Sequence, residues 1–239
     1  MPNDIITAPI LASRTVPQWP YAVNTASIQS YGLQWWYPVL PFYGTTLKDM
    51  GRKAEDTNTG ANITTADFAT HAKVGHYVDF NGTNEDIDTT INLSTDIPDL
   101  GDWAMACWVR PDDINDVEIV GYAIPAYMAD SGGFTAIGGC NLDSGGNGIY
   151  AYGWDGAEKS TSTPGTVTVG QWHHLCWHLK GGTLSCIVDG IVRDTVSCGD
   201  ITDLGGSEVV TLGSQGGSDF ANAGITDFRI YSTAPPLRS

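Results

Sequence analysis

Short stretches in which apolar and polar residues alternate recur along this chain, and alternation with a period of two is the pattern of half-buried β-strands. In HYVDFNG (76–82), Val78 and Phe80 fall on one face, and Tyr77 and Asp79 fall on the other. No segment shows sustained helical periodicity, and turn-forming residues separate the stretches at intervals of about 8 to 12 residues. The pattern therefore predicts an all-β fold.

Other stretches extend this pattern over most of the chain. WAMACWVR (103–110) alternates, GLQWWYPVLPFYGTTLKDMGR (32–52) begins with an aromatic strand, and Asp189-Gly190 is a strong signal for a two-residue hairpin. The polar residues 53–75 are predicted to form a long loop. The remaining predicted strands are 117–124, 133–139, 147–154, 166–168, 171–179, 183–195, 208–214 and 225–232. Strands at this spacing, without intervening helices, predict a two-sheet antiparallel β-sandwich.

Residues 1–31 differ from the rest and are predicted to form an extended N-terminal arm, ahead of a sandwich domain of residues 32–239. Four prolines interrupt the arm, so no helix is expected there. The arm is nevertheless too apolar for a disordered, solvated tail. Its candidate assembly residues are Ile5, Ile6, Ile10, Leu11, Trp19 and Tyr21. These side chains can pack on the arm's own sandwich or on a neighbouring subunit, and the sequence leaves both alternatives open.

The charge balance argues against one class of partner. Eleven Lys and Arg against 27 Asp and Glu give a formal charge of −16. Such a surface repels phosphate backbones, so nucleic-acid binding is not expected. No run of about 18 apolar residues occurs, so membrane insertion is not expected either. The N-terminus lacks the pattern of a secretory signal, and five cysteines without CxxC spacing are typical of free thiols in a reducing cytoplasm.

Four segments, in order, resemble the laminin-G-like, concanavalin A-like jelly-roll superfamily of lectins and glucanases. The family's opening Trp-Trp strand and Gly-Thr turn are similar to LQWWYP and YGTTLKDMGR. Its next two strands are similar to YVDFNGTNEDIDT and DWAMACWVRP. Its Trp-His-His, Val-Asp-Gly and Arg-Ile-Tyr elements are similar to GQWHHLCWHLKGGTLSCIVDGIVRDT and AGITDFRIYSTA. The resemblance covers residues 32–234 and implies a jelly-roll sandwich.

The first of these segments, in its long N-terminal form, also resembles tailed-phage proteins that carry this domain. That resemblance implies a non-enzymatic virion structural protein, a capsid decoration or fibre module of a bacteriophage, attached through its arm. Such a protein is made in bacterial cytoplasm, lies on the virion surface, and contacts other capsid or tail proteins as a homo-oligomer. A free carbohydrate-binding lectin or adhesin for cell-surface glycans is the alternative, and a glycoside hydrolase is the remote alternative.

The segment NGTNEDIDT (81–89) carries candidate metal ligands. Oxygen atoms of the kind that calcium takes occur close together just past a predicted strand. In calcium-using relatives a loop near this place contributes ligands, which implies the same for the resembling segment here. The metal candidates are Asn84, Glu85, Asp86 and Asp88. The expected fold requires no cofactor, and a bound calcium ion is the option that these residues leave open.

The segment YAYGWDG (150–156) carries the candidate glycan-binding residues. Tyr150, Tyr152 and Trp154 alternate, so they share one strand face, which ends in a loop at Asp155. Aromatic planes near a carboxylate can stack on sugar rings. Packing in the core or between subunits is the alternative role of these rings.

No catalytic residue is assigned. The glucanase branch of the resembling superfamily carries E-x-D-x-E on one strand, which places alternate carboxylates on one face. The nearest approach here is Asp116 and Glu118, with Val120 at the third position. Acidic residues at such a junction between a loop and a strand are usually solvated, so the protein is not expected to be an enzyme.

A run of histidines and a lone arginine have structural interpretations. His174, Cys176 and His178 lie on one face of a predicted strand, but three such side chains span about 13 Å, too far for one tetrahedral zinc ion. Arg229 lies between apolar neighbours, so we expect it to pair with a carboxylate such as Asp227 or Asp189.

Overall fold

The computed structural model describes residues 32–39, 44–59, 62–92, 96, 101–112, 122–129, 136–143, 148–161, 167–200, 209–214 and 220–233. In these ranges the chain consists mainly of β-strands, and the paired strands are antiparallel. The predicted all-β class is confirmed. The predicted arm of residues 1–31 lies outside the described residues.

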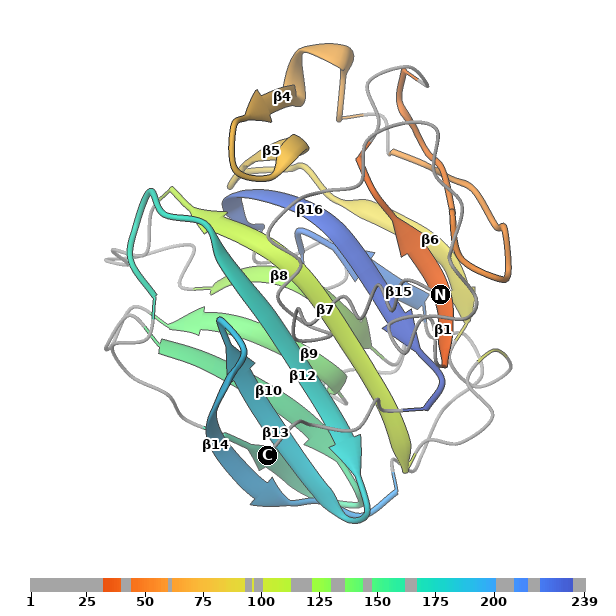
Figure 1. The fold of residues 1–239 in the computed structure, drawn as a ribbon, viewed down its shortest axis with the longest axis vertical. Helices are drawn as coiled ribbons and strands as arrows, with labels where there is room; N and C mark the ends of the chain where they lie inside the picture. The colour runs from red at the N-terminus through yellow and green to blue at the C-terminus, as the bar shows by residue number, and fades with distance from the viewer. Residues whose placement is uncertain are drawn as a thin grey trace, which may run out of the picture.

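Two sheets stack face to face, with the larger sheet in front of the smaller one in Figure 1. The larger sheet contains, in spatial order, β14 (Ile191–Ser197), β13 (Thr183–Val188), β12 (His173–Lys180), β7 (Asp102–Pro111), β16 (Asn222–Tyr231), β5 (Gly75–Asn81) and β4 (Phe68–His71), and β1 (Leu33–Tyr37) also pairs with β16. The smaller sheet contains β11 (Glu158–Ser160), β10 (Gly148–Trp154), β9 (Ala136–Asp143), β8 (Tyr122–Ala129), β15 (Val209–Leu212) and β6 (Ile87–Asn92). Together they form the predicted antiparallel sandwich.

The core lies between the two sheets and follows the alternation of the strands. Leu175, Trp177 and Leu179 of β12 point into it, as do Met105 and Cys107 of β7. From the smaller sheet and its vicinity the core takes Ile87, Ile91, Ala151, Val210 and Leu212. Apolar burial of this kind contributes on the order of 1.5–3 kcal/mol for each large side chain, so the core is the main source of stability.

The opposite face of the larger sheet, called the outer face below, is also buried. His174, Cys176 and His178 of β12 lie there, each with less than a tenth of its surface exposed. The same holds for Ala106 of β7 and Ile187 of β13. Strand β12 is therefore buried on both faces, which suits a central strand that has apolar or aromatic side chains on each face.

Strand β16 is the hub of the larger sheet. It pairs with β7 along its length, with β5 over its first half and with β1 over its second half. The change of partner occurs at a register shift between Thr226 and Arg229. Asp227 lies in this shift with φ 55°, a left-handed conformation that Asp tolerates better than most residues.

The prediction that residues 53–75 form one long loop is wrong. This segment contains β3 (Thr57–Asn58), which pairs with β2 (Thr46–Leu47), then the 3-10 helix η3 (Thr65–Asp67) and β4. A capping box between Thr64 and Asp67 starts η3. Because β4 is an edge strand with largely exposed side chains, it shows no apolar alternation in the sequence.

Other predicted strands are confirmed with shifted ends or are wrong. The Asp189-Gly190 hairpin is present, with positive φ at both residues and β13 and β14 on either side. No strand forms at 167–168, so the predicted strand 166–168 is wrong where it is described, and residue 166 lies outside the described residues. The sequence does not predict strand β11, because three polar residues give no periodicity. No helix in the described part is long and apolar enough to cross a membrane.

Candidate functional site

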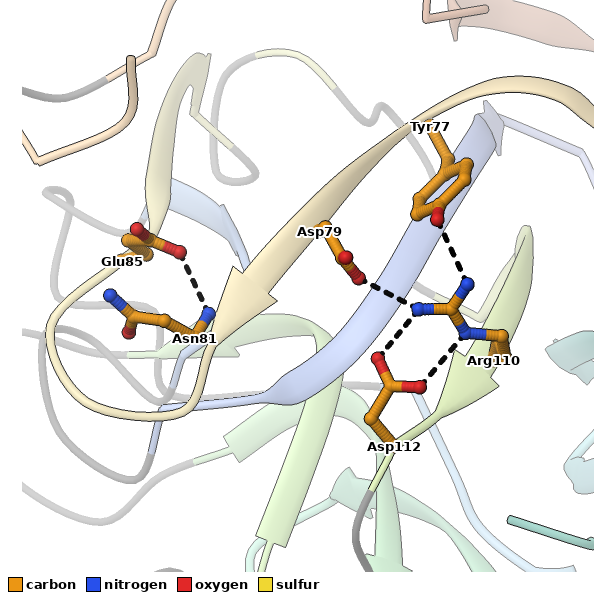
Figure 2. A network of polar contacts seen from close by, with 6 residues as sticks. All are labelled: Tyr77, Asp79, Asn81, Glu85, Arg110 and Asp112. Atoms are coloured by element: carbon orange, nitrogen blue, oxygen red, sulfur yellow. Dashed lines mark hydrogen bonds and ion pairs between the residues drawn. The ribbon is translucent and has the colours of Figure 1, made fainter. Parts of the chain in front are cut away.

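Arg110, near the end of β7, lies at the centre of a polar network at one end of the larger sheet (Figure 2). Its Nη1 donates to the Tyr77 hydroxyl at 2.9 Å, and its Nη2 donates to Asp79 at 2.9 Å. Its Nε and Nη2 donate to the two carboxylate oxygens of Asp112 at 2.9 and 2.7 Å. Such a bidentate contact fixes the plane of the guanidinium.

A glycine allows the network to form across three strands. Arg110 on β7 and Asp79 on β5 are both in register with Gly224 of β16, which lies between them. A Cβ atom on Gly224 would lie 2.9 Å from the Tyr77 ring and 3.0 Å from the Trp172 ring. The missing side chain leaves the space in which the Arg110 side chain and these rings meet above β16.

Aromatic rings form the floor of this network. The Arg110 guanidinium carbon lies 5.0 Å from the centre of the Tyr77 ring and 5.7 Å from that of Trp172, within range of cation–π attraction. Tyr77 and Trp172 contact each other edge to face, with ring centres 5.0 Å apart. Tyr77, Asp79, Arg110, Asp112 and Trp172 are called the Arg110 cluster below.

The Arg110 cluster is buried at its base and open at its carboxylates. Tyr77 and Trp172 are 6% and 4% exposed, whereas the side chains of Asp79 and Asp112 are 41% and 32% exposed. Partial burial raises the pKa of Asp79, the Arg110 charge lowers it, and the neighbouring Asp112 raises it further. Two carboxylates against one guanidinium leave the cluster with an excess of negative charge facing solvent.

The β5–β6 loop, which carries the predicted metal ligands Asn84, Glu85 and Asp86, lies beside the cluster in Figure 2, and the fourth, Asp88, lies on β6. Glu85 accepts a hydrogen bond from the Asn81 backbone N–H at 2.7 Å, and Asn84 accepts one from the Asn81 side chain at 3.0 Å. Asp86 instead accepts from the Ser214 hydroxyl at 2.8 Å, and the Asp88 carbonyl accepts from Thr57.

Glu85 and Asn84 thus both bind Asn81, whereas Asp86 binds Ser214. Among the residues that the structure describes, no group of three or more His, Cys, Asp or Glu side chains could hold a metal ion. Partial burial raises the pKa of both Glu85 and Asp88. Calcium binding at this loop stays a prediction.

The comparison with protein families settles what kind of domain this is. The family model described as the concanavalin A-like lectin/glucanases superfamily matches residues 81–236. The chain belongs to this superfamily. No curated protein matches the chain.

Solved structures share the fold of this superfamily member at low sequence identity. The chain is similar to a Trypanosoma rangeli sialidase in complex with the inhibitor DANA, with 15% identity and a TM-score of 0.63 over 95% of this chain and 34% of that one. It is also similar to the binding domain of botulinum neurotoxin serotype D, with 11% identity and a TM-score of 0.61 over 86% of this chain and 49% of that one. The chain thus spans between a third and a half of these proteins, and the likeness shows the fold alone.

Three of the predicted glycan-binding residues of this superfamily member lie on β10, and the fourth, Asp155, directly follows it. Tyr150, Tyr152 and Trp154 occupy alternate positions of the strand, as predicted, and their side chains lie outside the described residues. Asp155 accepts a hydrogen bond from the Gly199 N–H at 2.8 Å, which lowers its pKa, and Lys159 lies 3.5 Å away. Asp155 therefore links the β10–β11 hairpin to the segment after β14, and the stacking role of the rings stays a prediction.

Asp116 and Glu118, the weakly glucanase-like pair, lie outside the described residues. His174, Cys176 and His178 share the outer face of β12, as predicted. Burial lowers the pKa of His174 to about 3 and that of His178 to about 4, and burial raises the pKa of the Cys176 thiol. At neutral pH these three side chains are therefore uncharged.

The predicted partner of Arg229 is Asp227, with N–O distances between 2.7 and 3.0 Å in a buried pair that also receives the Trp36 indole N–H. Asp189, the alternative, accepts instead from the His174 backbone N–H and contacts His173 Nδ1 at 2.8 Å. His173 Nε2 accepts from the Thr168 N–H. Both ring nitrogens of His173 are thus engaged, so the Trp-His-His and Val-Asp-Gly elements of the superfamily fix a turn here.

Sequence reasoning missed the Arg110 cluster. Its only signal in the sequence is the placement of Tyr77 and Asp79 on one face of a strand and of Arg110 on the outer face of another. Nothing in the sequence indicates that these two strands flank the same glycine, because β16 follows β7 by more than a hundred residues.

Proposed function

We propose that this chain is a non-catalytic carbohydrate-binding domain, and that sugar hydroxyls bind at the Arg110 cluster. The observation that carries the proposal is the pair of partly exposed carboxylates, Asp79 and Asp112, which one guanidinium holds in place above two aromatic rings. Membership of the lectin/glucanase superfamily supports the same class of function.

The geometry suits hydroxyl groups for a physical reason. A carboxylate accepts hydrogen bonds from hydroxyls, and a charge-assisted bond of this kind is stronger than a neutral one. Arg110 already orders both carboxylates, so binding loses little side-chain freedom. Arg110 Nη1 carries two N–H groups and gives one to Tyr77, which leaves a donor for a sugar oxygen.

The charge of the cluster selects among sugars. Its excess of carboxylate, on a chain with a formal charge of −16, repels acidic sugars and favours neutral or amino sugars. One similar sialidase structure contains sialic acid, but that ligand belongs to the Trypanosoma rangeli protein, which is 16% identical over 95% of this chain and 35% of its own, with a TM-score of 0.61.

A glycan array read with and without calcium tests the function. We expect binding to neutral or amino sugars and none to sialylated glycans, and silence under both conditions would count against a lectin. Binding that requires calcium would support the predicted ligands Asn84, Glu85, Asp86 and Asp88.

Variants then locate the surface. The double substitution Asp79→Asn with Asp112→Asn should weaken binding by about tenfold or more, since two charge-assisted bonds are lost. Asp194→Asn, on the edge strand β14, is the matched control and should leave affinity unchanged. Loss of binding in Trp154→Ala, with the double variant unaffected, would move the site to β10.

The absence of catalysis is part of the proposal. Hydrolysis of a glycosidic bond needs one protonated and one ionised carboxyl group. Partial burial raises the pKa of Asp79 in spite of the Arg110 charge, but one guanidinium holds both carboxylates of the cluster, so neither is free to act as the second catalytic group. An assay for released reducing sugar on every glycan that binds should stay at background. Turnover that Asp79→Asn or Glu118→Gln abolishes would refute this part of the proposal.

A second candidate function is assembly into a virion through the arm. Its support is the sequence of residues 1–31, where six or more large apolar residues stand among four prolines, and the phage resemblance of the segment that follows. Deleting residues 2–30 should then abolish attachment to particles while the sandwich stays folded. Normal oligomerisation and attachment of the shortened chain would remove this candidate.

A further inference from the structure

The β5–β6 loop begins at Asn81-Gly82, one of two Asn-Gly pairs in the sequence. In such a pair the Asn side chain is prone to deamidation, because the Gly has no Cβ to hinder attack of its backbone nitrogen on the side-chain carbonyl carbon. Asn81 is exposed and lies beside the Arg110 cluster in Figure 2. The other pair is Asn147-Gly148, and Asn147 lies outside the described residues. Water therefore reaches a chemically labile residue next to the cluster.

The loop needs both residues of this labile pair. Gly82 has φ 71°, and a Cβ atom on it would lie 2.8 Å from the Cβ of Asn222. The Asn81 Oδ1 accepts hydrogen bonds from the backbone N–H groups of Thr83 at 2.8 Å and Asn84 at 3.2 Å, so this side chain closes the turn. The Asn81 Nδ2 donates to the Asn84 side chain at 3.0 Å. The side-chain amide that deamidation would remove is thus part of the loop's own structure.

The fold also keeps the two reacting groups apart. The Gly82 N–H, whose nitrogen would attack, donates to the Ala221 carbonyl at 2.9 Å. Asn81 ends the extended strand β5 in register with Asn222, and its own N–H donates to the Glu85 carboxylate at 2.7 Å. A five-membered ring between Asn81 and Gly82 requires a rotation about the Asn81 Cα–C bond that an extended strand does not allow. These hydrogen bonds must therefore open before the ring can close.

We propose that Asn81 is a deamidation site of this protein, and that opening of the β5–β6 loop controls its rate. In the open loop the Gly82 nitrogen loses its proton to water or hydroxide and forms a bond to the Asn81 Cγ. The bond between Cγ and Nδ2 breaks, and ammonia leaves. Water then opens the resulting succinimide ring at one of its two carbonyl carbons, which gives an aspartate or an isoaspartate at position 81. No other reactant is needed.

The product changes the edge of the Arg110 cluster. Asn81 and Asp79 share one face of β5, and same-face side chains on a strand are about 6.5–7 Å apart, so the new carboxylate repels that of Asp79. It also lies next to Glu85, which already accepts from the backbone of position 81. The isoaspartate form adds a methylene group to the main chain just before Gly82, so the hydrogen bond to Ala221 is displaced. Deamidation therefore alters charge and backbone together.

Peptide mapping by mass spectrometry tests the site and its protection. The chain is incubated at mildly alkaline pH, folded in one sample and unfolded in urea in the other. In urea, Asn81 and Asn147 should deamidate at similar rates, because both precede a glycine. In the folded sample, Asn81 should react about tenfold more slowly or less, since only the open loop reacts. An unreactive Asn81 in urea, where Asn147 reacts, would overturn the site, and equal rates with and without urea would overturn the protection.

Two variants then test the role of the loop. Asn84→Ala and Glu85→Ala each remove one hydrogen bond that holds Asn81, and each should accelerate its deamidation in the folded chain about threefold to tenfold. Their rates in urea should match that of the original chain. Asp194→Ala, on the edge strand β14, is the control and should change neither rate.

Urea denaturation establishes which variants are folded. Glu85 is buried, so its removal affects the fold more than that of the exposed Asn84. If Glu85→Ala is unfolded, the rate of Asn84→Ala decides. A folded variant that deamidates at Asn81 no faster than the original chain would overturn control by the loop.

Discussion

Arg110 reaches Asp79 across the whole width of β16, because the residue between them in both strand registers is Gly224. Any side chain at this position would occupy the volume in which Tyr77 and Trp172 meet. One backbone position thus connects three strands, a cation, two carboxylates and two rings. The residue at position 224 therefore determines whether the Arg110 cluster can form, although Gly224 itself has no side chain.

Gly224→Ala should therefore destabilise the fold and weaken sugar binding together. The added methyl group would overlap the Tyr77 and Trp172 rings, and overpacking of this kind costs about 1–3 kcal/mol. Urea denaturation followed by tryptophan fluorescence measures the change. Gly199→Ala is the control, since its nearest neighbour would be 3.5 Å away, and it should cost less than about 0.5 kcal/mol. Equal stability of the two variants would show that the rings move aside freely.

Removing the charge of Asp227 should be one of the most damaging single changes. Asp227 and Arg229 are both buried, and Trp36 donates to the same carboxylate, so Asp227→Asn leaves a guanidinium without its counter-charge. Loss of one partner from a buried pair costs about 3–5 kcal/mol. Asn tolerates the left-handed backbone conformation of this position as Asp does. The measured loss of stability is therefore due to the removed charge and not to backbone strain. Lys48→Ala, which breaks the exposed Lys48–Asp56 pair, should cost less than about 1 kcal/mol in the same denaturation experiment.

Acidification should weaken the fold through the buried histidines. Burial, aided by Lys180, lowers the pKa of His178 to about 4, and burial, aided by Arg229, lowers that of His174 to about 3, against about 6.5 in an unfolded chain. Below about pH 6.5 the unfolded chain binds protons that the folded chain does not. The free energy of unfolding therefore decreases as the pH is lowered, by up to about 1.4 kcal/mol per pH unit for each histidine. The free energy of unfolding, measured between pH 7 and pH 5, should show this slope.

In the same pH range, the partly buried carboxyl groups affect the stability in the opposite direction to the buried histidines. Partial burial raises the pKa of Asp49, Asp79 and Glu85, and protonation of these groups stabilises the folded chain as the pH approaches their raised values from above. Their contribution opposes that of the histidines and grows toward pH 4. His178→Gln should flatten the slope, whereas His71→Gln, at an exposed position, should not. Identical slopes for the two variants would contradict the assignment.

The Asp189 turn gives a prediction that compares two substitutions at one site. Asp189 has φ 53°, accepts from the His174 N–H and contacts His173, and these hydrogen bonds lower its pKa against the opposing effect of burial. Asp189→Ala loses both contacts and is strained at positive φ, so it should cost about 1–3 kcal/mol. Asp189→Asn keeps an acceptor and suits the turn, so thermal denaturation should show a clearly smaller drop in Tm. A larger drop for Asn than for Ala would contradict this account.

The sequence predicts the fold class well, because strand alternation is local. The parity of Val78 and Phe80, and that of Trp177 within its strand, follow from a period of two, and the Asp189-Gly190 hairpin follows from two neighbouring residues. The loop prediction for residues 53–75 fails because an edge strand needs no apolar face. The predicted placement of Tyr150, Tyr152 and Trp154 at alternate positions of β10 follows from the same period of two.

The Arg110 cluster could not be predicted in the same way. Its members come from β5, from β7 and the residue that follows it, and from the segment before β12, and they meet because β16 lies between the first two strands. Strand order is a property of the whole sheet, and alternation carries no information about it. The same limit explains why the sequence leaves two possible partners for Arg229. The register shift beside Arg229, which favours Asp227, is a feature of the sheet that the sequence does not indicate.

The central place of β16 has a consequence for biosynthesis. Until Tyr231 has left the ribosome, β7, β5 and β1 lack the strand that joins them, and each presents an unpaired edge. Contacts between such distant residues make folding slow, since a long loop must close before they form. The nascent chain therefore completes its larger sheet only after β16 has been synthesised. Chaperones that shield exposed strands would act on the chain until then.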